Sequence, residues 1–191
     1  MNYLAHLHLS GNNRETIIGN FIGDGVRGDE IDAYPPGIRE GILHHRRIDR
    51  FTDTHPVVLE SKKRLRPRFR KFAPVIADVF YDHFLARDWA DHHDEDLRHF
   101  VDRMYRLLEE NREIFPERSR RFLGYAVEND LLFRYATLEG IDLVFRGMAR
   151  RTRFESGMEA AAEELRENRN QYGKEFHRFF PDLVEKLGRL R

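Results

Sequence analysis

Apolar residues recur along most of the chain at three- and four-residue spacings, which is the period of an α-helix. The strict alternation of a half-buried strand is missing, and no Asn-Gly or Asp-Gly pair joins two apolar runs as in a β-hairpin. The pattern therefore predicts an all-α protein. Because the sequence contains no internal repeat and no convincing linker, we expect residues 1–191 to form one helical-bundle domain.

Proline and glycine residues divide this pattern into segments. The first nine residues are ambiguous, since His6 and His8 share one face of a strand but lie about 200° apart on a helix. The expected helices cover residues 16–27, 38–53, 74–89, a segment that follows 88–96 and runs to about 111, 117–135, 138–151, and a last helix that begins near Ser156 and is interrupted by Pro181.

The segment 38–53 is the most informative part of the chain. On a helix, His45, Asp49 and Asp53 fall at i, i+4 and i+8, inside an arc of roughly 80°. An imidazole beside two carboxylates is ligand chemistry for a divalent cation, and it also suits an acid–base pair. Alternatively, the two carboxylates only balance the arginines of the same segment on a solvated face.

The apolar segment 74–89 carries Asp82 and His83 within or beside its buried arc. A buried carboxylate needs a cation, an arginine or several hydrogen-bond donors as its partner, and a metal ion would meet that need. The alternative for His83 is a histidine whose hydrogen bonds are satisfied within the core.

Asp24 follows the apolar part of the segment 16–27. A carboxylate near the C-terminal end of a helix is unfavourable unless another charge compensates it. Arg27 can be its structural partner or a group that binds phosphate, and the neighbouring glycines leave room for a ligand. The alternative is an aspartate in an ordinary turn.

Composition narrows the choice of function. Lys+Arg and Asp+Glu both number 33, so the net charge is zero, which argues against general affinity for nucleic acid or membranes. The absence of cysteine excludes disulfides, thiolate metal sites and a cysteine nucleophile. The chain starts without a signal-peptide pattern and has no apolar run long enough to span a bilayer, so we expect a cytoplasmic protein.

Four blocks in the same order resemble the acyl carrier protein phosphodiesterase family. They are Asn2–Leu9, Gly19–Gly28, Gly41–Asp53 and Tyr81–Trp89. The resemblance implies an all-α fold distantly related to the HD-domain phosphohydrolases. It also implies a phosphodiesterase that uses a divalent metal, with Mn²⁺ as the expected ion and Mg²⁺ or another divalent ion as the alternative. Such an enzyme removes the 4′-phosphopantetheine arm from holo acyl carrier protein. HD proteins pair His and Asp in adjacent positions, whereas here Arg46 follows His45.

Within this family chemistry, the expected metal ligands are Asp24, His45, Asp82 and His83. Phosphodiester cleavage needs an activated water and compensation of the phosphate charge. We assign water activation to Asp49 and phosphate binding to Arg46 or Arg27. His6 is a candidate for the general acid or for a further ligand.

The stretch 62–71 is strongly basic, with seven positive charges in ten residues. They are Lys62, Lys63, Arg64, Arg66, Arg68, Arg70 and Lys71. By itself the run is typical of a solvated helix face, but the resemblance predicts a docking surface for an acidic carrier protein. Two other functions stay open, namely an HD-type nucleotide phosphohydrolase and a non-catalytic helical binding protein.

Overall fold

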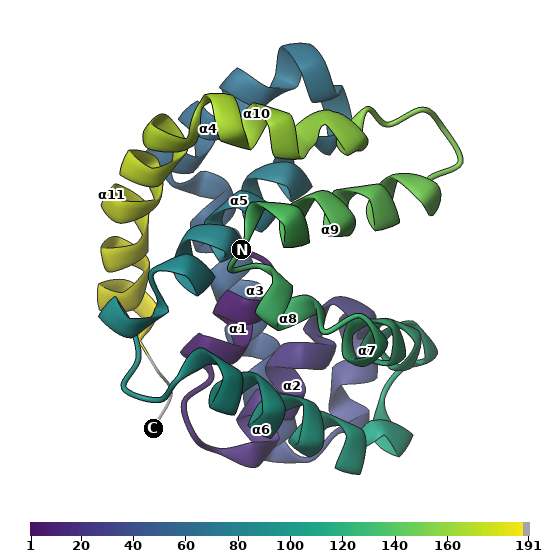
Figure 1. Ribbon diagram of the computed structural model, residues 1–191. Coiled ribbons are helices and arrows are strands. Elements are labelled where there is room, and N and C mark those ends of the chain that lie inside the picture. The colour runs from purple at the N-terminus through teal and green to yellow at the C-terminus, as the bar shows by residue number, and fades with distance from the viewer. Residues whose placement is uncertain (189–191) are drawn as a thin grey trace.

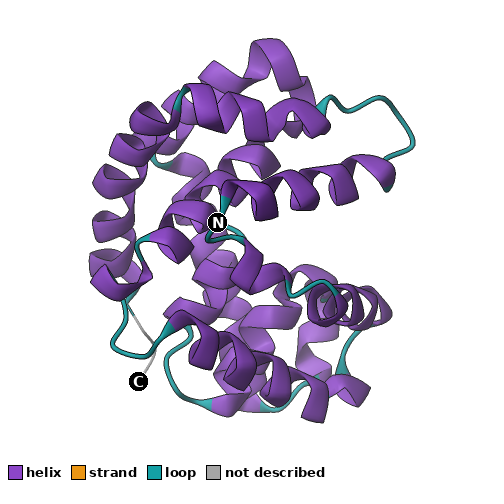
Figure 2. Cartoon of the chain, viewed as in Figure 1, coloured by secondary structure: helices purple, strands orange, loops and turns teal. Residues whose placement is uncertain are grey.

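The computed structural model describes residues 1–188. Within this range the chain forms eleven α-helices and six short 3-10 helices and contains no strand (Figure 2). The prediction of an all-α fold is therefore confirmed, while the distant relation to HD domains stays a prediction. Among the helices of this range, none is both long and apolar enough for a membrane span.

The element bounds are as follows. The α-helices are α1 (Tyr3–Leu9), α2 (Arg14–Ile22), α3 (Pro36–Thr54), α4 (Pro56–Phe69), α5 (Ala73–Arg87), α6 (Leu97–Glu110), α7 (Glu117–Glu128), α8 (Leu131–Arg134), α9 (Leu138–Arg150), α10 (Ala161–Glu167) and α11 (Arg169–Leu187). The 3-10 helices are η1 (Gly23–Gly25), η2 (Gly28–Ala33), η3 (Arg70–Phe72), η4 (Trp89–Asp91), η5 (Arg112–Ile114) and η6 (Met158–Ala160).

Helices α1 and α5 form the centre of the molecule (Figure 1). Eleven of the fifteen residues of α5 are buried, and so are six of the seven in α1, so both are covered on nearly all sides. In the view of Figure 1, α11 runs along one side, α4 and α10 cross the top, α2 and α6 lie at the bottom, and α7 to α9 close the remaining side. A short helix such as α1 is held by this packing and not by its own length.

Two glycines allow α2 and α3 to approach closely. A Cβ atom on Gly19 would lie 2.0 Å from the carbonyl oxygen of Ile38, and one on Gly41 would lie 2.3 Å from the carbonyl oxygen of Thr16. No larger residue fits at this crossing without moving backbone. The contact brings the C-terminal end of α2 against the middle of α3, where His45 is located.

Three expected helix boundaries are wrong. The first predicted helix ends at Ile22 and continues only as the 3-10 turn η1. The segment 117–135 is divided because Asp130 adopts a left-handed conformation with φ 48°, which no α-helix contains. The last segment is two helices, and α11 runs through Pro181 to Leu187 because the buried residues around the proline hold it in the core.

Candidate active site

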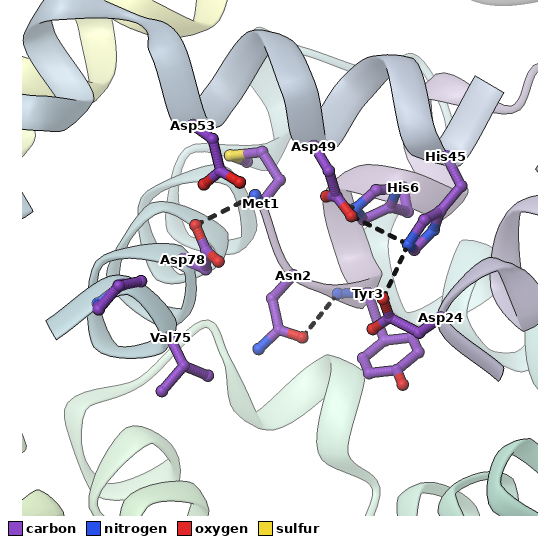
Figure 3. Close-up of a pocket in the computed structure, with 11 residues that line it drawn as sticks. Met1, Asn2, Tyr3, His6, Asp24, His45, Asp49, Asp53, Val75 and Asp78 are labelled. Carbon is purple, nitrogen blue, oxygen red and sulfur yellow. Dashed lines mark hydrogen bonds and ion pairs between the residues drawn. The ribbon is translucent and has the colours of Figure 1, made fainter. Parts of the chain in front are cut away.

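Two histidines and an aspartate from different helices meet at one point. His6 of α1 places Nε2 3.1 Å from Asp49 Oδ1, and His45 of α3 places Nε2 3.1 Å from Asp49 Oδ2. The two imidazole rings stack with centroids 4.0 Å apart. One ligand atom from each residue lies within 4.8 Å of the others, so the three residues can hold a metal ion (Figure 3).

Asn20 of α2 fixes the orientation of both rings. Its Nδ2 donates to the carbonyl oxygen of His6 and to Ser10 Oγ, which leaves its Oδ1 as an acceptor. His6 Nδ1 lies 2.9 Å from this Oδ1, and His45 Nδ1 lies 2.8 Å from the Asn20 carbonyl oxygen. Both rings must therefore carry a proton on Nδ1, and both direct Nε2 at Asp49.

The charges in the cluster lack one cation. Burial and the neighbouring His45 lower the pKa of His6, so its ring is neutral and its unprotonated Nε2 faces a carboxylate oxygen. An acceptor opposite an acceptor is unfavourable unless a cation lies between them. Burial raises the pKa of Asp49, but its contacts with His45 and His6 outweigh burial and hold this pKa well below its usual range. The donor set thus fits a divalent metal.

Asp24 adds a second carboxylate to the cluster. Its Oδ1 lies 3.2 Å from His45 Nε2, while its side chain is about half exposed (53%) at the mouth of the cleft. Burial disfavours a charge on His45, but the hydrogen bonds to Asp24 and Asp49 raise the pKa of this histidine to about 9. The charge that compensates Asp24 is therefore His45, and not Arg27 as the sequence suggested.

Gly23 makes room for the imidazole of His45. A Cβ atom at this position would lie 2.4 Å from His45 Cγ. The expectation that the glycines beside Asp24 leave space for a ligand is wrong for Gly23, because the space is filled by a side chain of the same protein.

Asp82 and His83 have other partners. Asp82 Oδ1 accepts from the N–H of Asn2 at 3.1 Å, and its Oδ2 accepts from the N–H of Leu4 at 2.8 Å. Burial raises the pKa of Asp82 to about 7. His83 Nδ1 donates to the carbonyl oxygen of Tyr135 at 2.7 Å. The hydrogen-bond donors that this buried carboxylate needs are thus two backbone N–H groups at the start of α1. Through them Asp82 anchors the helix that carries His6.

The two arginines expected to bind phosphate lie outside the cleft. Arg46 donates to the carbonyl oxygen of Val26 at 3.1 Å and so ties α3 to the chain after η1. Arg27 is exposed and forms no ion pair within residues 1–188. Neither side chain lines the space around the histidines.

The basic run is partly neutralised within the fold. Its internal ion pairs are Lys62 with Asp53, Arg64 with Glu175 and Arg68 with Glu164. Asp53 is consequently occupied, and the third member of the predicted i, i+4, i+8 set does not join His45 and Asp49. The basic residues without an acidic partner in the described part of the chain are Lys63, Arg66, Arg70 and Lys71.

The cluster lies in an acidic cleft of about 270 Å³. Asp53, Asp49 and His45 project into it from α3, and Asp24 and Asp78 face them (Figure 3). Asn20, the residue that orients the histidines, was missed by sequence reasoning. The sequence does contain a signal for Asn20, namely an amide side chain inside an apolar helix. A polar group buried there must have hydrogen-bond partners.

Fold and site together define an all-α protein with a histidine–carboxylate cluster, the donor chemistry of metal-dependent hydrolases. Residues 1–183 match the family model described as acyl carrier protein phosphodiesterase. Relatives with this name include those of Photorhabdus laumondii, with 32% identity over 97% of this chain and 94% of the relative, and of an Enterobacter species, with 35% identity over 96% of both. An Escherichia coli relative is 34% identical over 99% of this chain and 98% of its own.

No solved structure matches the chain. The chain belongs to the acyl carrier protein phosphodiesterase family.

Proposed function

We propose that this protein hydrolyses the phosphodiester that links 4′-phosphopantetheine to a serine of holo acyl carrier protein, giving the apo protein. Membership of the family and the names of relatives that match nearly the full length support this substrate. The observation that carries the chemistry is the pair of Nε2 atoms, fixed by Asn20, that face one carboxylate.

The proposed metal ligands are His6, His45 and Asp49, with Asp24 at the open side. This set replaces Asp82 and His83, which the backbone of α1 and of Tyr135 engages. A divalent cation bound there would lower the pKa of a bound water and neutralise charge on the phosphate oxygens. Mixed imidazole and carboxylate donors suit a borderline ion, and Mn²⁺ is the ion we propose, with Mg²⁺ as the alternative.

The roles of the protein's own residues shift accordingly. Because Asp49 contacts both imidazoles, we assign it to metal binding and give the proton-accepting role to Asp24, whose carboxylate is exposed at the mouth. His6, whose pKa is lowered, suits a ligand and not a general acid.

We propose that the acidic carrier protein docks on the four basic residues that have no acidic partner in residues 1–188. Two of them, Arg70 and Lys71, lie on η3, directly before Pro74 and Val75 in the cleft wall. Complementary charge would raise the association rate, and added salt would weaken the effect.

The test compares Asp49→Ala with Asp53→Ala, which changes the same helix and the same cleft. We expect the wild type to bind one Mn²⁺ and to release 4′-phosphopantetheine from holo carrier protein, measured by metal analysis and by mass spectrometry of the carrier. Asp49→Ala should lose the metal and at least about 100-fold in turnover with unchanged helical content, while Asp53→Ala keeps both. A metal-free wild type without activity would favour a non-catalytic binding protein, and cleavage of nucleotides alone would favour the HD-type alternative.

A further inference from the structure

A groove of about 910 Å³ continues from the acidic cleft between α7 and α9. The two spaces share the lining residues Met1, Asn2, Tyr3, Asp24, Val75 and Asp78, so they form one continuous depression. The cleft alone is smaller than the roughly 300–1,000 Å³ of typical small-molecule sites, whereas the groove lies within that range.

The floor of the groove is apolar and well packed. Tyr3 stacks on Phe122 of α7 with ring centroids 3.8 Å apart, which fixes the wall between cleft and groove. Beyond this wall the lining includes five aromatic and aliphatic side chains, namely Tyr125, Leu131, Tyr135, Val144 and Met148, and its charged residues are Glu117, Arg118, Arg121 and Arg151. Such a surface suits a long ligand segment without charge.

The groove carries positive charge where the cleft carries negative charge. Arg118 and Arg151 line it, and neither forms an ion pair within the part of the chain that the structure describes. The guanidinium of Arg151 lies 4.4 Å from the centre of the Tyr125 ring. Both arginines line the groove together with Tyr3 and Asp24, which also line the cleft.

An unpaired arginine at a groove mouth is suited to an anion, above all to a phosphate. The groove therefore fits a molecule with an anionic head at the junction and an extended, uncharged body.

We propose that the groove binds the 4′-phosphopantetheine arm of the substrate, with its phosphate between the histidine–carboxylate cluster and Arg118 and Arg151, and its uncharged amide chain on the floor between α7 and α9. The inference rests on the proposed function and adds to it the residues that hold the leaving product. It also assigns phosphate binding to Arg118 and Arg151. Arg27 and Arg46 do not take this role, because they lie outside the cleft.

The first experiment measures binding of free 4′-phosphopantetheine and of pantetheine, which lacks the phosphate, by calorimetry. Met148→Trp fills the groove and should weaken both ligands at least tenfold. Its matched control is Leu143→Trp on the same helix, because Leu143 is 49% exposed and does not line the groove. Thermal melting of each variant shows that it is folded.

Arg118→Ala should weaken 4′-phosphopantetheine about tenfold and leave pantetheine unchanged, since only the phosphate contacts the guanidinium. The control is Arg106→Ala on α6, an exposed arginine outside the groove. If Met148→Trp and Arg118→Ala bind 4′-phosphopantetheine as the wild type does, the inference is wrong.

Hydrolysis of holo carrier protein separates this inference from the proposed function. A wild type that binds 4′-phosphopantetheine in the groove but leaves holo carrier protein intact would overturn the function and retain the groove. A wild type that cleaves holo carrier protein, together with an equally active Met148→Trp variant, would retain the function and overturn the groove.

Discussion

At the scale of single residues, Asn20 orients both histidines of the site although it does not line the cleft. It holds His6 through its side-chain oxygen and His45 through its backbone carbonyl, and neither contact touches the cleft itself. Residues of this kind set the tautomer and direction of a metal-binding imidazole.

We predict that Asn20→Leu lowers the affinity for Mn²⁺ by about 10- to 100-fold, the usual effect of removing a partner of a ligand. The substitution removes the hydrogen bonds of the Asn20 side chain to the His6 ring, the His6 carbonyl and Ser10, whereas the backbone carbonyl that binds His45 remains. Calorimetric titration of the metal-free protein measures the change. Ser10→Ala is the control, since it keeps both acceptors of Asn20, and equal affinities in the two variants would contradict the prediction.

At the scale of elements, the position of α1 depends on Asp82. This carboxylate of α5 accepts two N–H groups at the beginning of α1, where a helix has donors without internal partners. The position of His6 within the site thus depends on a contact between residues about eighty positions apart in the sequence.

Asp82→Ala should lower the free energy of unfolding by about 3 kcal/mol, because it leaves two backbone donors without their acceptor. Asp82→Asn keeps one oxygen and should lose less. Denaturant titration measures the stability, and metal analysis of the folded Asn variant should give the wild-type content. A stable Asp82→Ala protein that cannot bind metal would instead make Asp82 a ligand, as the sequence alone suggested.

The crossing of α2 and α3 gives a second element-level prediction. Gly19→Ala should destabilise the protein by about 3 kcal/mol or more, because the added Cβ meets backbone at 2.0 Å and the helices must separate. Gly124→Ala in α7 is the matched control. A Cβ atom there meets nothing within 4 Å, and alanine should stabilise the helix by roughly 0.5–1 kcal/mol. Equal melting temperatures for the two variants would refute the close crossing.

At the scale of the whole molecule, two buried histidines make stability depend on pH. His44 Nε2 donates to the carbonyl oxygen of Leu9, and burial lowers its pKa to about 4. Burial likewise lowers the pKa of His83 to about 4. Both groups lie in the core, away from the exposed mouth of the cleft.

Because these pKa values are lower in the folded than in the unfolded state, acid favours unfolding. The stabilising contribution is complete above about pH 6.5, the unfolded value, and is lost as the pH falls toward 4. Each histidine contributes on the order of 3 kcal/mol over this window. Denaturant titrations between pH 4 and 7 should show the slope, and His44→Gln should reduce it. A His44→Gln protein with the same slope would show that other groups cause the acid sensitivity.

Local periodicity was sufficient to predict most of the long helices, but not α1 or α4, and it predicted one edge of the site. The spacing of His45 and Asp49 places them on one face of any helix, and the structure has them together. Helix ends were harder to predict, because the left-handed backbone at Asp130 divides one segment and the buried neighbours of Pro181 keep another helix continuous, and the local pattern indicated neither.

What the sequence determined by itself is the all-α class and the need of Asp82 for a partner, since periodicity and the cost of burying charge are properties of short segments. Only the tertiary structure decided that this partner is the backbone of α1, that Asn20 orients both His6 and His45, and that Tyr3 and Arg151 border the same groove. Each of these contacts links residues far apart in the chain. Their meeting depends on how whole helices pack, which no local pattern encodes.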